Sequence, residues 1–384
     1  MLNFTFQNPT KIHFGEGQIV KITREIPKDA KVLVIYGGGS IKKNGVYQQV
    51  VDALKNHSWL EFSGIEPNPQ YDTAMKAVQF IKNEGIDYLL AVGGGSVVDA
   101  VKFIAAASLY EGEDPWDILS KGAKVKDALP FGVVLTLPAT GSESNNGSVM
   151  SKGDDKLFFG SPLTFPKFAV LDPATTLTLS DRQISNGVID AFVHTMEQYV
   201  TYPVNAKIQD RFAEGILHTL IEEGPKALNE ETKNDLEVRG NIMWSATMAL
   251  NNLIGSGVPQ DWATHMIGHE LTALHHIDHA RTLSIVLPAT LKICREAKRE
   301  KLIQYGKRIW ELNGSDEEIM DKAIAKTEEF FRTMQVPVRL SDAGLDETTI
   351  EPVLQKLQQH GFTALGEHQN IDLEVVRKIL KAAL

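Results

Sequence analysis

Five of the 11 histidines in the chain lie in one stretch, HMIGHELTALHHIDH, at residues 265–279. Imidazole is a frequent metal ligand and acid–base group, so the spacing of these residues matters. His265 and His269 are four residues apart and share one face of a helix. His275 and His276 are adjacent and point about 100° apart, so they cannot both serve a site on the same helix face. The stretch therefore offers the pair His265 and His269 as its first candidate.

A second polar pair lies upstream, in GVIDAFVH. Asp190 and His194 are also four residues apart, on a helix that is otherwise apolar. Burying a carboxylate and an imidazole is costly unless they bind something, although a simple hydrogen bond on the helix surface is the alternative. Because two such pairs occur, a metal site is the better interpretation. The zinc-protease motif H-E-x-x-H is absent, since Ala273 occupies its last position.

The tetrapeptide GGGS occurs twice, at 37–40 after the apolar run 31–36 and at 93–96 after the run 87–92. Glycine lets the backbone approach a ligand closely, and a following helix start offers free N–H groups to a phosphate. Neither turn fits G-x-G-x-x-G. One such turn alone is compatible with an ordinary strand–helix connection, but two in one α/β half favour nucleotide binding.

Other residues near these turns extend the expected cofactor site. Asp99 falls in the first helical turn, where it either caps the helix or touches the cofactor. The stretch TLPATGSES at 136–144 forms either a third cofactor loop or an ordinary Ser/Thr turn. The first GGGS turn is followed by Lys42 and Lys43 and holds no carboxylate, which favours NADP(H) over NAD(H). The alternative is that both lysines are solvated surface residues.

The elements that position these residues change character halfway along the chain. Continuous apolar runs alternate with helical patterns in the first half, which predicts a buried parallel sheet. The expected strands are 31–36, 60–64, 87–92, 131–138 and 168–172, and the expected helices are 46–57, 73–85 and 97–108. Only helices are predicted after residue 180, over 180–200, 206–224, 236–255, 261–275 and 280–312, with another opened by a capping box at 315–318. We therefore expect an α/β domain over 1–180 and an all-α domain over 181–384, with the ligand site between them.

The composition excludes several classes of function. The 384 residues are 43% apolar with a net charge of −10, which argues against a nucleic-acid or anionic-membrane partner. The single cysteine, Cys294, excludes an internal disulfide and fits a reducing compartment. The N-terminus lacks a signal-peptide pattern, and no run of about 18 apolar residues occurs. We expect a cytoplasmic protein.

Several motifs resemble those of the iron-containing alcohol dehydrogenase family, whose fold is shared with dehydroquinate synthase. They are VGGGSVVDAVK at 92–102, TLPATGSE at 136–143, DAFVHTMEQYV at 190–200 and GVPQDWATHMIGHELTALHHIDHARTLSIVLP at 257–288. Their order matches over essentially the whole chain. The stretch YGGGSIKKNG at 36–45 resembles in particular the bacterial NADPH-dependent aldehyde reductases and butanol dehydrogenases of that family.

The resemblance implies a Rossmann-like α/β domain, a helical metal-binding domain and a role for each matching residue. One divalent ion, zinc or iron(II), would be held by Asp190, His194, His265 and His279. His269 would stay unligated beside the substrate and nicotinamide, with His275 and His276 as loop or surface residues. The expected NADP(H) contacts are Gly93, Gly94, Gly95 and Ser96 at the pyrophosphate, Gly37, Gly38 and Ser40 around the adenosine ribose and its phosphate, and Asp99, Thr136, Thr140 and Lys156 along the remaining channel.

The implied activity is reversible reduction of small-to-medium aliphatic aldehydes to primary alcohols with NADPH. Phe192 and Trp262 would give the pocket apolar walls. Two alternatives are a metal-dependent lyase or cyclase on the same fold and an inactive sensor of NADPH and metal. A lyase or cyclase of this kind would need basic residues near the metal. Such residues are scarce there, and Arg281 is the nearest one. A homodimer is expected, in which the apolar segment 2–14 adds a strand to a neighbouring sheet.

Overall fold

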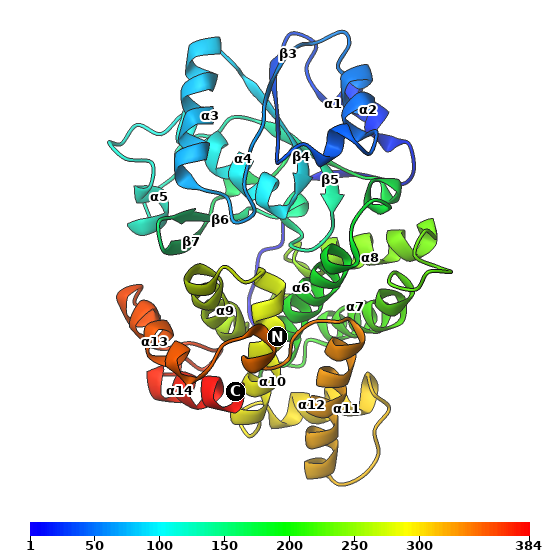
Figure 1. Cartoon of the computed structure of the whole chain (residues 1–384), viewed down its shortest axis with the longest axis vertical. Coiled ribbons are helices and arrows are strands. Elements are labelled where there is room, and N and C mark those ends of the chain that lie inside the picture. The colour runs from blue at the N-terminus through cyan, green and yellow to red at the C-terminus, as the bar shows by residue number, and fades with distance from the viewer. The chain divides into compact units, whose positions relative to one another are not determined.

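The computed structural model describes all residues 1–384, and the chain divides into two compact units. The first, called the sheet unit below, contains residues 7–179 and 235–243. The second, called the helical unit, contains residues 1–6, 180–234 and 244–384. The blue-to-green elements of Figure 1 carry the sheet, and the green-to-red elements are helices.

A six-stranded, fully parallel sheet forms the centre of the sheet unit. Its strand order is β1-β8-β5-β4-β2-β3. The strands are β1 (Lys11–Phe14), β2 (Lys31–Tyr36), β3 (Ser58–Phe62), β4 (Tyr88–Gly94), β5 (Phe131–Leu137) and β8 (Phe168–Leu171). The central strands are buried along almost their whole length, because both faces of a parallel sheet are covered. The predicted buried parallel sheet is confirmed.

Helices cover the two faces of this sheet. Figure 1 places α3 (Tyr71–Glu84) and α4 (Gly95–Ser108) together, with α1 (Ile22–Glu25) and α2 (Val46–Ala53) apart from them. Leu33 and Leu89 pack in the core that includes α3 and α4, whereas their strand neighbours on the opposite face pack in the core that includes α1 and α2. One short helix, α5 (Asp117–Ser120), also belongs to this unit.

Two features of this unit differ from the expectations. Residues 11–14, part of the segment expected to extend a neighbouring sheet, form β1 and pair with β8 of the same chain. The strand expected at 60–64 begins two residues earlier, at Ser58, where its pairing with Lys31 of β2 begins.

An antiparallel hairpin, β6 (Gly147–Lys152) and β7 (Asp155–Gly160), was not predicted. Its pairing leaves only Gly153 and Asp154 as the loop, and Gly153 has a positive φ of 59°. A Gly-Asp dipeptide between two short runs is a hairpin signal. The hairpin was not predicted because charged and polar residues on either side of this dipeptide interrupt any apolar run.

The topology brings the predicted cofactor loops to one edge. β5, β4 and β2 are adjacent and parallel, so their carboxyl ends lie side by side. The loops that follow them are 136–144, the second GGGS turn and the first GGGS turn. In the sheet, β3 lies on one side of β2 and β4 lies on the other. The strand order therefore reverses direction between β2 and β4. Such a topological switch point is the usual ligand-binding position in parallel sheets.

The helical unit contains no strand, as predicted for the chain after residue 180. Its helices are α6 (Asp181–Tyr199), α7 (Lys207–Lys226), the second half of α8 (Leu236–Ala249), α9 (Ala263–His275), α10 (His279–Ile293), α11 (Arg299–Arg308), α12 (Asp316–Thr333), α13 (Ile350–Gln359) and α14 (Leu373–Ala382). The capping box expected at 315–318 is present, because the Ser315 and Glu318 side chains each bond the other's backbone N–H. The segment 280–312 forms two helices, broken near Lys298. None of the helices combines the length and the apolar character needed to cross a membrane.

Candidate functional site

Helix α6 positions the first pair of candidate ligands. The helix begins with a capping box between Ser180 and Gln183, and its apolar residues are buried around Asp190 and His194. Both side chains are buried, and His194 Nε2 lies 3.8 Å from Asp190 Oδ1. The i, i+4 spacing therefore brings the carboxylate and the imidazole together inside the unit.

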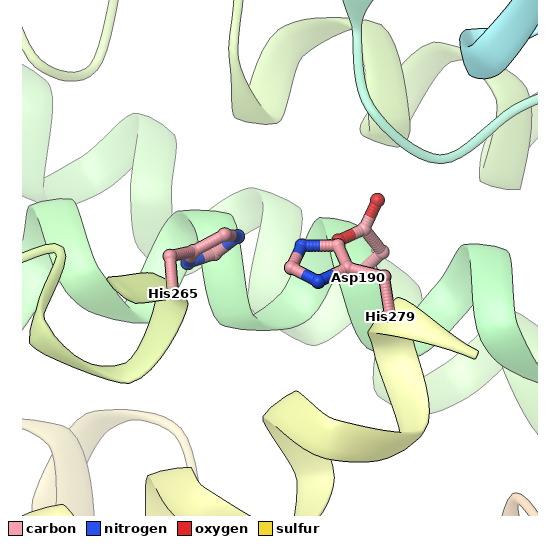
Figure 2. A group of neighbouring side chains, drawn as sticks. All are labelled: Asp190, His265 and His279. Atoms are coloured by element: carbon pink, nitrogen blue, oxygen red, sulfur yellow. The ribbon is translucent and has the colours of Figure 1, made fainter. Parts of the chain in front are cut away.

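Two histidines from other helices meet this carboxylate. His265 lies in the first turns of α9, and His279 is the first residue of α10. Asp190, His265 and His279 each offer one ligand atom, and these three atoms lie within 4.8 Å of one another. Figure 2 shows the two imidazoles facing each other with the Asp190 carboxylate beside them. A carboxylate and two imidazoles at such distances can bind one divalent ion.

His194 borders the same group. Its ring stacks on that of His265 with centroids 4.5 Å apart, and it faces the same Asp190 oxygen as His279, which lies 3.9 Å from it. Burial lowers the pKa of His194 to about 4. The imidazole is therefore neutral at pH 7, the form that binds a metal. One carboxylate with neutral imidazoles fits zinc or iron(II).

The remaining histidines of the stretch lie in two different places. His269 is buried one turn after His265, with its ring centroid 4.7 Å from that of His279. His275 contacts Thr349, and His276 ends α9 in a left-handed conformation with φ 55°. His269 thus lies beside the candidate metal group, whereas His275 and His276 lie at the helix end.

The two expected apolar walls have different environments. Trp262 precedes α9 with a positive φ of 61°, and its ring centroid lies 5.3 Å from that of His265. A bulky residue in this backbone region is strained, and such strain clusters at functional sites. Phe192 instead packs on Phe330 and Phe331 and is fully buried in an aromatic core. The pocket role expected for Phe192 is therefore wrong.

The second GGGS turn, Gly93 to Ser96, is tightly packed in the sheet unit. β4 ends at Gly94 and α4 begins at Gly95, so no loop residue separates them. A Cβ at Gly95 would lie 2.4 Å from Thr140 Oγ1. Glycine is thus required for the close approach of the 136–144 loop, and the helix start is left with its N–H groups at the sheet edge.

Asp99 makes contacts inside the sheet unit that the sequence did not predict. It does not cap α4, whose N-cap has no side-chain bond. Its Oδ1 accepts from Ser142 Oγ at 2.5 Å, and its Oδ2 accepts from the backbone N–H of Val149 at 2.9 Å. Burial raises the pKa of Asp99, and the charge of Lys102 opposes that effect. Asp99 therefore fastens α4 to the loop that follows β5.

Lys102, which sequence reasoning overlooked, completes this arrangement. Its side chain is fully buried, and its ammonium group donates to Ser142 Oγ, Asn145 Oδ1 and the carbonyl oxygen of Gly147 at 2.7–2.8 Å. A lysine within an otherwise apolar helical run was the available signal, because such a residue is buried only when its donors are satisfied.

The first GGGS turn is more open. Gly38 and Ser40 are exposed, and a Cβ at Gly38 would meet nothing within 4 Å. Lys42 Nζ lies 4.6 Å from the ring centroid of Tyr47 and 3.1 Å from Glu61 Oε1. Lys42 is thus anchored beside the turn by an aromatic ring and a carboxylate.

The other expected cofactor residues also lie in the sheet unit. Thr136 is buried near the end of β5, and Thr140 Oγ1 accepts from the backbone N–H of Ser142 at 3.2 Å. Lys156 is buried on β7 and donates to Asn68 Oδ1 at 2.9 Å. Gly37 lies close to the Ile65 carbonyl, where an added Cβ would be 3.2 Å from that oxygen.

Comparison with known proteins agrees with this architecture over the whole chain. The family model for iron-containing alcohol dehydrogenases matches residues 9–173, and the model for the C-terminal part of the Fe-containing alcohol dehydrogenase family matches residues 184–384. The chain belongs to the iron-containing alcohol dehydrogenase family. The family resemblance inferred from the motifs is confirmed.

Two relatives of this family member show how far the likeness extends. The NADPH-dependent aldehyde reductase YqhD of Escherichia coli strain K12 is 59% identical, with both chains covered completely. A crystal structure of that protein has a TM-score of 0.98 over 100% of this chain and 99% of its own. The NADH-dependent butanol dehydrogenase A of Thermotoga maritima is 38% identical with a TM-score of 0.95, over 100% of this chain and 99% of its own.

Proposed function

We propose that this protein reduces aldehydes to primary alcohols with NADPH in a metal-dependent, reversible reaction. The observation that carries the proposal is the convergence of Asp190, His265 and His279, whose ligand atoms lie within 4.8 Å of one another. The full-length identity of 59% to an enzyme named as an NADPH-dependent aldehyde reductase supports the same activity. Residues 1–180 would bind the dinucleotide, and residues 181–384 would bind the metal.

Asp190, His194, His265 and His279 would hold one divalent ion, zinc or iron(II). When bound, the ion polarises the aldehyde carbonyl and the nicotinamide of NADPH supplies the hydride. The protein's contribution is a donor set that is fixed in place, since three different helices present these four side chains. Burial of Asp190 and His265 also keeps bulk water from these donors.

His269 would supply the proton that completes the alcohol. It lies one helical turn beyond His265 and is directed into the same cluster, with ring centroids 6.2 Å from His265 and 4.7 Å from His279. Histidine is the side chain whose ordinary pKa suits proton transfer near neutral pH. In the oxidation direction the same imidazole would accept the proton of the alcohol.

The carboxyl edge of the sheet would bind NADPH. Gly93, Gly94, Gly95 and Ser96 present the start of α4 to the pyrophosphate, and Gly37, Gly38 and Ser40 leave room for the adenosine ribose and its 2′-phosphate. Asp99, Thr136, Thr140 and Lys156 would line the rest of the channel, with Asp99 acting through the loop that it holds. The absence of a carboxylate in the first turn favours NADPH over NADH.

Two further proposals concern substrate and assembly. Trp262 would form an apolar wall for aliphatic aldehydes, because its indole lies against the rings of His194 and His265. The chain would act as a homodimer in the cytoplasm. The exposed side chains of Met1, Leu2, Phe4 and Phe6 support assembly, since isolated monomers rarely expose such a run.

The test is the initial rate of cofactor oxidation with butanal. We expect a fast rate with NADPH, a slow rate with NADH, and no rate after the protein is stripped with a chelator. His265→Ala should lose both metal and turnover, whereas His269→Ala should keep its metal and turn over slowly. No activity with either cofactor in metal-loaded protein would overturn the proposal, and equal metal loss in both variants would show that the role of His269 is misassigned.

A further inference from the structure

A carboxylate outside the proposed ligand set touches one of the ligands. Glu197 lies on α6, three residues after His194, and is almost completely buried. Its Oε2 contacts His265 Nδ1, and its Oε1 accepts from the backbone N–H of Thr264 at 2.7 Å. Its main-chain oxygen also accepts from the backbone N–H of Asp261 at 2.9 Å. Glu197 therefore joins α6 to the start of α9.

The contact at Nδ1 selects one form of the His265 ring. An ion bound at Nε2 would use the lone pair of that nitrogen, so the proton of the neutral ring would lie on Nδ1, where Glu197 Oε2 can accept it. Figure 2 shows one ring nitrogen of His265 directed toward His279 and Asp190. With Nδ1 bound to Glu197, that nitrogen is Nε2.

We propose that Glu197 is a positioning residue of the metal site, which fixes the tautomer and ring orientation of His265 so that Nε2 binds the ion. This inference rests on the metal site of the proposed function. Carboxylates behind metal-bound histidines act in this way in general, by fixing the ring and raising the basicity of the ligand.

A buried network of charged side chains interacts electrostatically with Glu197. Lys298 Nζ lies 2.9 Å from Asp261 Oδ2 and 2.7 Å from Glu367 Oε1, and it donates to the carbonyl oxygen of Val200 at 3.0 Å. Burial, and then the charge of Asp261, raises the pKa of Glu197 well above its usual range, although the Thr264 N–H and the charge of Lys298 act in the opposite direction.

A purely structural role is the rival explanation. Thr264 lies in the first turn of α9, so the bond from its N–H makes Glu197 a remote cap of that helix. Glu197→Gln separates the two roles. Its amide oxygen can still accept from Thr264, but its NH₂ group would then face His265 Nδ1 and force the proton onto Nε2.

The matched control is Glu270→Gln. Glu270 is another buried carboxylate on α9, and its Oε1 lies 2.8 Å from Nδ1 of His360, which is not among the proposed ligands. We would measure zinc affinity of the metal-free proteins by chelator competition, together with their thermal unfolding. Glu197→Gln should bind zinc about ten- to hundredfold more weakly than wild type. Glu270→Gln should keep wild-type zinc affinity even where its melting temperature falls.

Wild-type zinc affinity in Glu197→Gln would overturn the inference and leave the metal site intact. A loss of zinc affinity in Glu270→Gln equal to that in Glu197→Gln would also overturn it, because a general loss of stability would then explain both. A wild-type protein that binds neither zinc nor iron(II) would overturn the proposed function on which the inference rests.

A measurement on the wild-type chain covers the case in which Glu197→Gln does not fold. Protein labelled with ¹⁵N-histidine and loaded with ¹¹³Cd reports by NMR which ring nitrogen binds the ion. We expect coupling of cadmium to Nε2 of His265 and a proton on Nδ1. Coupling to Nδ1 would overturn the inference.

Discussion

At Gly93, Gly94 and Gly95 an added Cβ would lie 3.0 Å or less from Val97, Leu137 or Thr140, whereas at Gly38 it would meet nothing. The two turns have the same four residues, GGGS, and both lie at the carboxyl end of a central strand of one sheet. In the second turn the protein's own packing requires glycine. In the first turn Gly38 faces open space, which leaves room for a ligand.

The side chains that support the two turns differ in the same way. Lys102, on the helix after the second turn, is buried and donates to three acceptors of one loop. Lys42, just after the first turn, lies at the surface against Tyr36, Tyr47 and Glu61. An identical tetrapeptide therefore forms part of the core in one place and part of an open surface in the other.

The largest effect is expected for Lys102→Met. It leaves the acceptors of the 142–147 loop unsatisfied and Asp99 without its neighbouring positive charge, so the free energy of unfolding should fall by about 3–5 kcal/mol. Denaturant titration measures this change. Lys124→Met, at an exposed lysine, is the control and should change the free energy by less than about 0.5 kcal/mol. Equal effects would contradict the contrast between the turns.

The protonation of Lys102 provides the next test. Burial lowers its pKa to about 8, below the ordinary lysine value of 10.5, while Asp99 and Glu143 act in the opposite direction. From about pH 8 to about 10.5 the unfolded chain binds a proton that the folded protein has released, so this group makes stability rise with pH. The slope of unfolding free energy against pH over this window should be more positive in wild type than in Lys102→Met. Identical slopes would show that Lys102 does not titrate there.

Gly95→Ala should destabilise the protein by about 1–3 kcal/mol, because the added Cβ overlaps Thr140. The double variant Gly95→Ala with Thr140→Gly removes the overlap. A double-mutant cycle in denaturant should therefore give a favourable coupling energy. Additive effects would mean that glycine is required at 95 for another reason.

Gly38→Ala should have the smallest effect on folding, within about 0.5 kcal/mol, since its Cβ meets nothing. If the ribose phosphate of NADPH occupies this space, the same variant should raise the KM for NADPH. A loss of stability comparable to that of Gly95→Ala would remove the distinction between the turns, and an unchanged KM would place the phosphate elsewhere.

Apolar runs and helical periods predicted most of the fold. Strands β2, β4, β5 and β8 and the helices around them have strong periodic signals, because burial on both faces of a sheet leaves continuous apolar stretches. The hairpin of β6 and β7 and strand β1 lack that signal, since half or more of each is polar or exposed. Strand β1 is defined only by its pairing with the distant β8, and the hairpin by the pairing of its two neighbouring strands.

The candidate metal site was predictable because its residues repeat at helical spacing. Asp190 with His194 and His265 with His269 show this pattern directly. Their meeting with His279 depends on how three helices pack, and only the family resemblance suggested it. Glu197 was overlooked because it resembles an ordinary charged helix residue in the sequence, and only its burial and partners reveal its role. Lys102 was overlooked although its place in an apolar helical run was a signal of burial.

The division of the chain into two units has a consequence for experiments that split the protein into fragments. The polypeptide passes between the sheet unit and the helical unit after residues 6, 179, 234 and 243. A cut at residue 180 therefore leaves the first six residues of the helical unit on one fragment and Asp235–Met243 of the sheet unit on the other. Neither half is a self-contained module. We expect the two fragments to fold only when they are combined with each other. The protein therefore suits a split-reporter design better than an exchange of whole domains.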